Sequence, residues 1–172
     1  MSEQLSHALL KWMDSVSRTM NPAGALSCHK ECTKMVDLQC DLLLVQTLDR
    51  LISQSKSENE SPSEETNPSE LLSKIVNDLE EIYHYHDMSE LRPSSDGIYS
   101  ELHVQKIVER TLGCVMLFGD QSDTQQYVEP IMELEQGPQM CLMQSIQVSL
   151  IHSMGNIPTL DIFILCLSCT QL

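Results

Sequence analysis

The chain has 172 residues, of which 25 are acidic and 10 are Lys or Arg, so its formal net charge at pH 7 is −15. This length fits one domain with its own hydrophobic core. The negative charge argues against binding to nucleic acid and against attraction to an anionic membrane surface, because both need clusters of Lys and Arg. It favours a basic partner instead. Few aromatic residues, together with 10 Met, favour helices over a sheet.

The start of the chain and its cysteines indicate a cytoplasmic protein with free thiols. No basic region followed by an apolar stretch opens the chain, as it would in a signal peptide. The odd count of seven Cys is typical of reduced thiols that act as small hydrophobic residues. Cys28-His29-x-x-Cys32 and Cys166-x-x-Cys169 each resemble half of a zinc site, but neither has a second half at suitable spacing. We therefore expect no metal and no cofactor.

Two helices are predicted in the first 51 residues, at 5–16 and at 37–51. Each has apolar residues at steps of three and four, which places them on one helix face. These residues are Leu5, Leu9, Trp12, Met13 and Val16 in the first helix, and Leu38, Leu42, Val45 and Leu48 in the second. Trp12, the single tryptophan, is expected to anchor the core. Asn21-Pro22 is expected to end the first helix.

Residues 53–70 are predicted to form an acidic loop. They contain no apolar residue except two prolines and are mostly Ser and Glu. Such a segment buries too little surface to offset the entropy lost on ordering it. A solvated insertion is the simpler interpretation. A linker controlled by phosphorylation at Ser61-Pro62 is the alternative.

A third helix is predicted to open at residues 67–70. Its apolar stripe consists of Leu71, Leu72, Ile75, Leu79 and Ile82. His84 and His86 follow at its end and lie on different sides of a helix, so we interpret them as exposed cations near a helix C-terminus. Residues 92–97 are rich in turn-forming residues and are predicted to connect to the next helix.

A fourth helix is predicted at residues 99–118 and is expected to be the central one. Its apolar residues are Leu102, Ile107, Val108, Leu112, Val115 and Met116. Gly113 is expected to allow a neighbouring helix to approach closely. A short helix should follow, capped by Asp123, with Pro130 kinking it or moving its start.

A last helix is predicted to start at Gly137-Pro138 and to run to residue 154. Pro is favoured in the first turn, where its missing N–H would have no partner. One apolar stripe contains Met143, Ile146, Leu150 and Met154, and a second row contains Met140, Leu142 and Ile151. A helix that is apolar on two sides is either the centre of a bundle or one wall of a groove that takes another helix.

Several stretches together resemble the N-terminal Hook domain of the Hook family of microtubule adaptors. The stretches that carry the resemblance are Leu112-Gly113-Cys114-Val115, residues 125–135 with Tyr127-Val128-x-x-Ile131-Met132, and residues 139–147 with Gln139 and Ile146. Residues 5–12 and 37–48 are similar to the first two helices of that domain. The resemblance implies an all-α, calponin-homology-like helical bundle with an additional C-terminal helix, covering residues 1–154.

The resemblance also implies a function. Hook domains receive an amphipathic helix of the dynein light intermediate chain in a hydrophobic groove and link cargo to microtubule-based transport, in the cytoplasm and at the centrosome. The family's partner-facing Gln and Ile match Gln139 and Ile146, two turns apart on one face. The expected partner-binding residues are Gln139, Met140, Met143, Ile146 and Leu150. The alternative is that Met143 and Ile146 fill the domain's own core.

Residues 155–172 lie outside the resemblance and are expected to be an atypical apolar tail. Their apolar part, residues 160–169, is shorter than the ~20 residues of a membrane-spanning helix. They lack the heptads of the coiled coil that follows the Hook domain in the family. A girdin-like scaffold head without a motor partner, or a truncated product, is therefore the alternative function. No catalytic motif is present, so no enzyme activity is expected.

Overall fold

The computed structural model describes residues 2–21, 34–55, 67–82, 89–118 and 121–154. Every regular element in these ranges is a helix, which confirms the all-α prediction; the finer calponin-homology-like arrangement stays a prediction. The α-helices are α1 (Ser2–Met20), α2 (Leu42–Ser55), α3 (Pro68–Ile82), α4 (Glu101–Phe118), α5 (Gln121–Met132) and α6 (Gln136–Met154). Two 3-10 helices are η1 (Met35–Cys40) and η2 (Ser89–Leu91).

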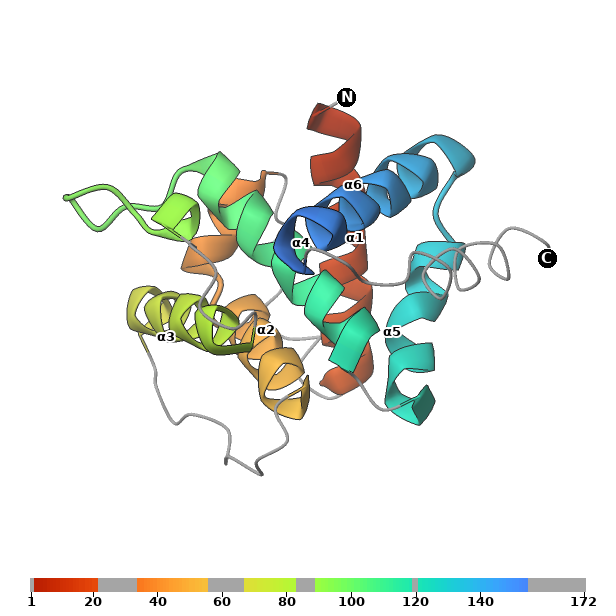
Figure 1. Cartoon of the computed structure of the whole chain (residues 1–172), viewed down its shortest axis with the longest axis horizontal. Helices are drawn as coiled ribbons and strands as arrows, with labels where there is room; N and C mark the ends of the chain where they lie inside the picture. The colour runs from red at the N-terminus through yellow and green to blue at the C-terminus, as the bar shows by residue number, and fades with distance from the viewer. Residues whose placement is uncertain (1, 22–33, 56–66, 83–88, 119–120, 155–172) are drawn as a thin grey trace.

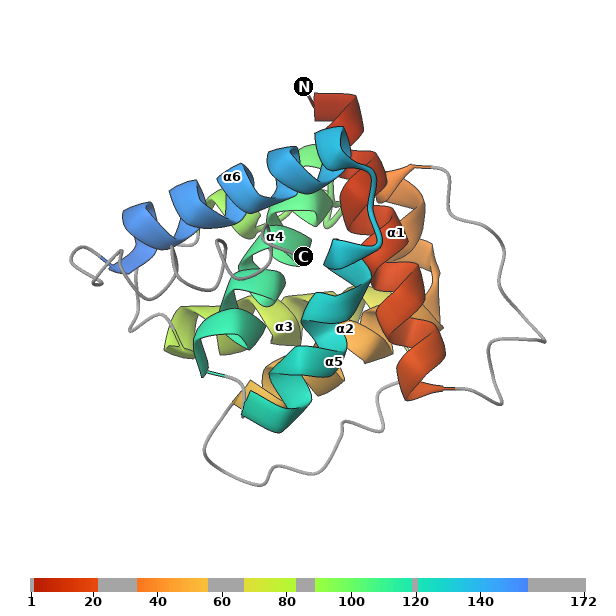
Figure 2. The same cartoon turned by 90° about the vertical axis from the view of Figure 1, so that its right-hand side faces the viewer.

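Helix α4 lies at the centre of the bundle, as predicted for residues 99–118. It contacts every other α-helix and both 3-10 helices. In Figure 1 it runs diagonally through the middle, with α2 and α3 on one side and α5 on the other. Helix α6 lies across α1 and α4 along one end of the molecule, which Figure 2 shows at the top.

One hydrophobic core joins all six α-helices. Its largest fully buried side chains include Trp12, Met13, Leu48, Leu72 and Tyr99. Trp12 lies on α1, and its indole Nε1 donates a hydrogen bond of 2.8 Å to the backbone oxygen of Tyr127 on α5. A buried indole N–H needs such a partner. The expectation that Trp12 anchors the core is therefore confirmed.

Polar side chains cap the beginnings of α2 and α3. Asp41 accepts a hydrogen bond of 3.2 Å from the backbone N–H of Leu44, and its own carbonyl accepts the first helical bond, from Val45. Asn67 does the same at α3, where its side-chain oxygen accepts from the N–H of Ser69 at 3.1 Å. Such caps satisfy N–H groups that have no partner inside the helix.

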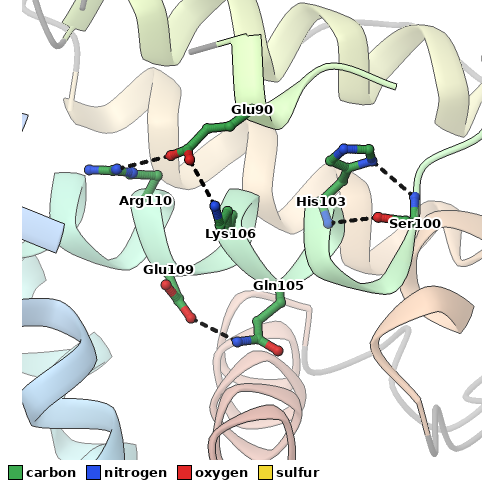
Figure 3. A network of polar contacts seen from close by, with 7 residues as sticks. All are labelled: Glu90, Ser100, His103, Gln105, Lys106, Glu109 and Arg110. Atoms are coloured by element: carbon green, nitrogen blue, oxygen red, sulfur yellow. Dashed lines mark hydrogen bonds and ion pairs between the residues drawn. The ribbon is translucent and has the colours of Figure 1, made fainter. Parts of the chain in front are cut away.

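A network of polar contacts fixes the start of α4 (Figure 3). Ser100 and His103 cap each other: the Ser100 N–H donates to His103 Nδ1, and the His103 N–H donates to Ser100 Oγ, both at 3.2 Å. This is a capping box with His where Glu or Gln is usual. Glu90 of η2 accepts from Lys106 at 2.8 Å and from Arg110 at 3.3 Å, which ties the segment before α4 onto α4 itself.

The structure corrects several sequence-based boundaries. The helix predicted at residues 37–51 is two elements, because Asp41 has extended backbone (φ −97°, ψ 99°) and caps a new helix. Helix α2 continues to Ser55, into the loop predicted at residues 53–70, whereas α3 begins at Pro68, as predicted for the helix that opens at residues 67–70. Asp123 lies inside α5 rather than at its cap, and α5 continues past Pro130 to Met132.

Leu102, one of the apolar residues of the predicted central helix, is 57% exposed. Other predictions lie outside the described residues: most of the acidic loop, His84 and His86, the two Cys half-motifs and the apolar tail.

Candidate functional site

Helix α6, which carries the five predicted partner-binding residues, is held in place at its first turns. The Glu135 carbonyl accepts the first helical bond, from the N–H of Gln139. The Gln139 side-chain amide reaches back to the Ile131 carbonyl of α5 at 3.2 Å and closes the corner between α5 and α6. The Cys141 thiol donates to Gln4 Oε1 of α1 at 3.6 Å. The N-terminal half of α6 is therefore tied to two other helices.

The buried side of α6 is formed by Leu142 and Ile146. Their exposed fractions are 0% and 1%, and both belong to the common core. Met143 is half-buried and packs against that core. Leu142 and Ile146 are four residues apart, so they lie on one face and point to α1 and α4 together.

The burial of Ile146 corrects the expectation of an open groove lined by this residue. At 1% exposure, Ile146 has no free surface to offer a partner in this conformation. The alternative stated from the sequence, that Ile146 fills the domain's own core, describes the structure better. The periodicity of residues 143–154 could not separate these alternatives, because both place an apolar stripe on one helix face.

The exposed side of α6 carries Met140, the only one of the four predicted partner-binding residues with described side chains that is largely accessible. Met140 is 53% exposed, and Gln136, Gly137 and Gln144 on the same side are also exposed. Gln139 is half-buried at the border between the two sides. Leu150 lies on α6, but its side chain is outside the described part of the chain. We call residues 136, 137, 140 and 144 the outer face of α6.

A second exposed apolar pair, Ile98 and Leu102, lies at the start of α4 and is missing from the sequence-based site. These residues are 62% and 57% exposed. The sequence held a signal for Leu102. The buried residues of α4 include Val104, Ile107 and Val108, and a position two residues before Val104 falls about 200° away on a helix.

Two buried aspartates, Asp49 and Asp78, pair with a half-buried lysine. Lys74 of α3 donates to Asp49 of α2 at 2.7 Å and to Asp78 at 3.0 Å. Burial opposes the charge of the Lys74 ammonium, but its hydrogen bonds and the charges of both aspartates outweigh this effect and raise the pKa of Lys74. Lys74 therefore stays protonated at neutral pH and is no base or nucleophile. It joins α2 to α3.

Among the described residues, no group of three or more His, Cys, Asp or Glu side chains could hold a metal ion. None of the described helices is long and apolar enough to cross a membrane.

Comparisons with protein-family models, with curated proteins and with solved structures give no match to this chain. The resemblance to the Hook domain therefore remains an expectation from the sequence. The candidate site lies on α6, where Leu142 and Ile146 are buried in the core and Met140 is exposed on the outer face.

Proposed function

We propose that the chain is a helical adaptor domain that binds an amphipathic helix of the dynein light intermediate chain and links cargo to microtubule-based transport in the cytoplasm. The observation that supports this function most directly is the 53% exposure of Met140, on the helix that the resemblance assigns to partner binding. Half-buried Met143 and Gln139 lie at the edge of the outer face. Met side chains adapt well to the apolar residues of a partner helix.

The burial of Ile146 changes its role in this proposal. Ile146 supports α6 from the core side, while Met140 provides the accessible apolar contact. An Ile146→Asp variant would bury an unpaired carboxylate and is expected to unfold the domain, so it cannot test binding. Met140 is suitable, because an exposed residue tolerates substitution with little effect on stability.

The test is a fluorescence-polarisation titration of the full chain with a light-intermediate-chain helix peptide. Met140→Asp should weaken binding at least about tenfold, since it places a carboxylate in an apolar contact. Leu102→Asp is the matched control, because Leu102 is equally exposed on a different helix, and it should bind as wild type. Circular dichroism should report equal helix content for all three proteins. The proposal is wrong if the wild-type chain does not bind the peptide, or if both variants bind equally well.

The second candidate function is a structural, girdin-like scaffold head without a motor partner. The burial of Leu142 and Ile146 favours it, because it uses the apolar stripe of α6 for the fold itself. Failure of the wild-type chain to bind the peptide would support this function.

A further inference from the structure

Positive charge is absent from the last part of the sequence. The final Lys or Arg is Arg110, and residues 111–172 contain six Asp or Glu: Asp120, Asp123, Glu129, Glu133, Glu135 and Asp161. Elsewhere in the described bundle, several acidic side chains have cationic partners. Glu90 pairs with Lys106, Glu80 with Arg92, and Asp14 with Arg18.

Two of the carboxylates in this region directly precede the outer face of α6 in the chain. Glu133 and Glu135 lie in the connection that leads into α6, and both are exposed. Within the described residues, neither forms an ion pair with Lys or Arg. The surface therefore combines one accessible apolar side chain, Met140, with uncompensated negative charge at its N-terminal end.

From this combination we infer that the outer face of α6 selects a partner helix with Lys or Arg residues beside an apolar anchor. The apolar anchor would contact Met140, and the cations would pair with Glu133 and Glu135. Complementary charges at the rim of an interface speed encounter and reject like-charged partners. The inference deepens the proposed function and rests on it for the location of the surface, but the chemistry of the partner follows from the charges.

Charge also disfavours two other occupants of this face. A second copy would present the same carboxylates in a two-fold interface, so that negative charges would face each other. Residues 155–172 contain no Lys or Arg and one Asp, so they offer no complementary charge. A basic segment of another protein is the occupant that fits.

The experiment compares two synthetic amphipathic helical peptides with the same Leu face, one with Lys and one with Glu on the polar face. Both are titrated into the full chain, with its Met methyl groups labelled with ¹³C, at low and at high salt. We expect the Lys peptide to bind with an affinity that falls as salt rises, and the Glu peptide to bind at least about tenfold more weakly. The Met140 methyl signal should shift, while signals of the buried Met13 and Met35 should not.

Two double variants test whether Glu133 and Glu135 are the carboxylates that attract the Lys peptide. Glu133→Gln with Glu135→Gln should weaken binding of the Lys peptide about 3- to 10-fold, as expected for two exposed ion pairs. Glu70→Gln with Glu101→Gln removes the same number of exposed charges from other helices and should leave the affinity unchanged. Equal losses in both double variants, equal binding of the two peptides, or an unshifted Met140 signal would each overturn the inference.

The light-intermediate-chain peptide separates this inference from the proposed function. If that peptide binds with no dependence on salt or on Glu133 and Glu135, the proposed function stands and the inference fails. If that peptide does not bind but the Lys peptide docks at Met140, the inference stands for another basic partner and the proposed function fails.

Discussion

Trp12 begins a chain of hydrogen bonds that joins three helices. Its side chain is fully buried on α1, and its N–H donates to the Tyr127 carbonyl of α5. The Tyr127 hydroxyl in turn donates to Gln54 Oε1 of α2 at 2.8 Å. This chain of contacts places α5 against both helices, although α5 has few buried side chains of its own among the described residues.

Substitution of Trp12 separates its packing from its hydrogen bond. Trp12→Ala should lower the free energy of unfolding by roughly 3–5 kcal/mol, because it leaves a large cavity. Trp12→Phe keeps much of the volume but removes the donor for the Tyr127 carbonyl, and should lower it by about 1–3 kcal/mol. Urea denaturation measures both values. Equal losses in the two variants would show that the shared loss of the hydrogen bond outweighs the lost packing, whereas an unchanged Trp12→Phe variant would show that the hydrogen bond contributes little.

The stability that Glu90 contributes to the fold depends on pH. The hydrogen bond from Lys106 is the main reason why the pKa of Glu90 is lowered from its ordinary value of 4.5; burial opposes it, and Arg110 adds to it. A lowered pKa in the folded state stabilises the fold above the ordinary value, and this contribution is lost as the pH falls through the folded-state pKa.

Wild type should therefore be more stable than Glu90→Gln at pH 7, and the difference should shrink as the pH falls below 4.5. Thermal melts between neutral and acidic pH measure this difference. Glu101→Gln, which changes an exposed carboxylate that forms no ion pair among the described residues, is the control and should be nearly as stable as wild type at pH 7. A difference for Glu90→Gln that stays constant across the range would contradict the assignment.

At the scale of the element, the stability of α4 depends on the capping of its first turn. Ser100 and His103 satisfy each other's backbone N–H groups at the first turn of the central helix. The N–H of Ser100 can donate to His103 Nδ1 only while that nitrogen carries no proton.

Ser100→Ala should lower the free energy of unfolding by about 1 kcal/mol, as loss of an N-cap side chain does. His103→Gln is the matched variant, because Gln at this position completes the usual capping box and should keep the stability of wild type. Chemical denaturation at neutral pH compares them. A Ser100→Ala variant as stable as wild type would show that α4 is held by packing alone.

At the scale of the whole molecule, the net charge of −15 is expected to lower the stability of the fold. Like charges in a compact fold repel one another, and salt screens this repulsion. Raising NaCl from about 0.02 M to about 0.3 M should therefore raise the urea midpoint of the full chain, with most of the gain at the lowest concentrations, where the Debye length changes most. A midpoint that falls with salt would mean that ion pairs such as Lys74 with Asp49 outweigh the net repulsion.

The spacing of apolar residues in the sequence was enough to predict the helices. It failed to predict a helix boundary where a polar side chain caps a new helix. The buried faces of α1 and α3 follow their apolar spacing residue by residue, apart from the half-buried Leu5 and Ile82 at their ends. The break at Asp41 was missed, because a carboxylate that caps a following helix looks the same in sequence as one exposed on a continuous helix. Leu102 was counted among the apolar residues of the predicted central helix, but the phase of α4 places it opposite the buried Val104.

The sequence by itself determined the helical class, the central position of residues 99–118 and the burial of Trp12, since these depend on spacing and hydrophobicity along the chain. It also determined the excess of negative charge after Arg110. Only the tertiary structure decided which side of α6 is free. Two apolar rows share that helix, and contact with α1 and α4 buries Leu142 and Ile146 while Met140 stays accessible. Which side of α6 is buried depends on how helices that are distant in the sequence pack together. A local sequence pattern does not contain this information.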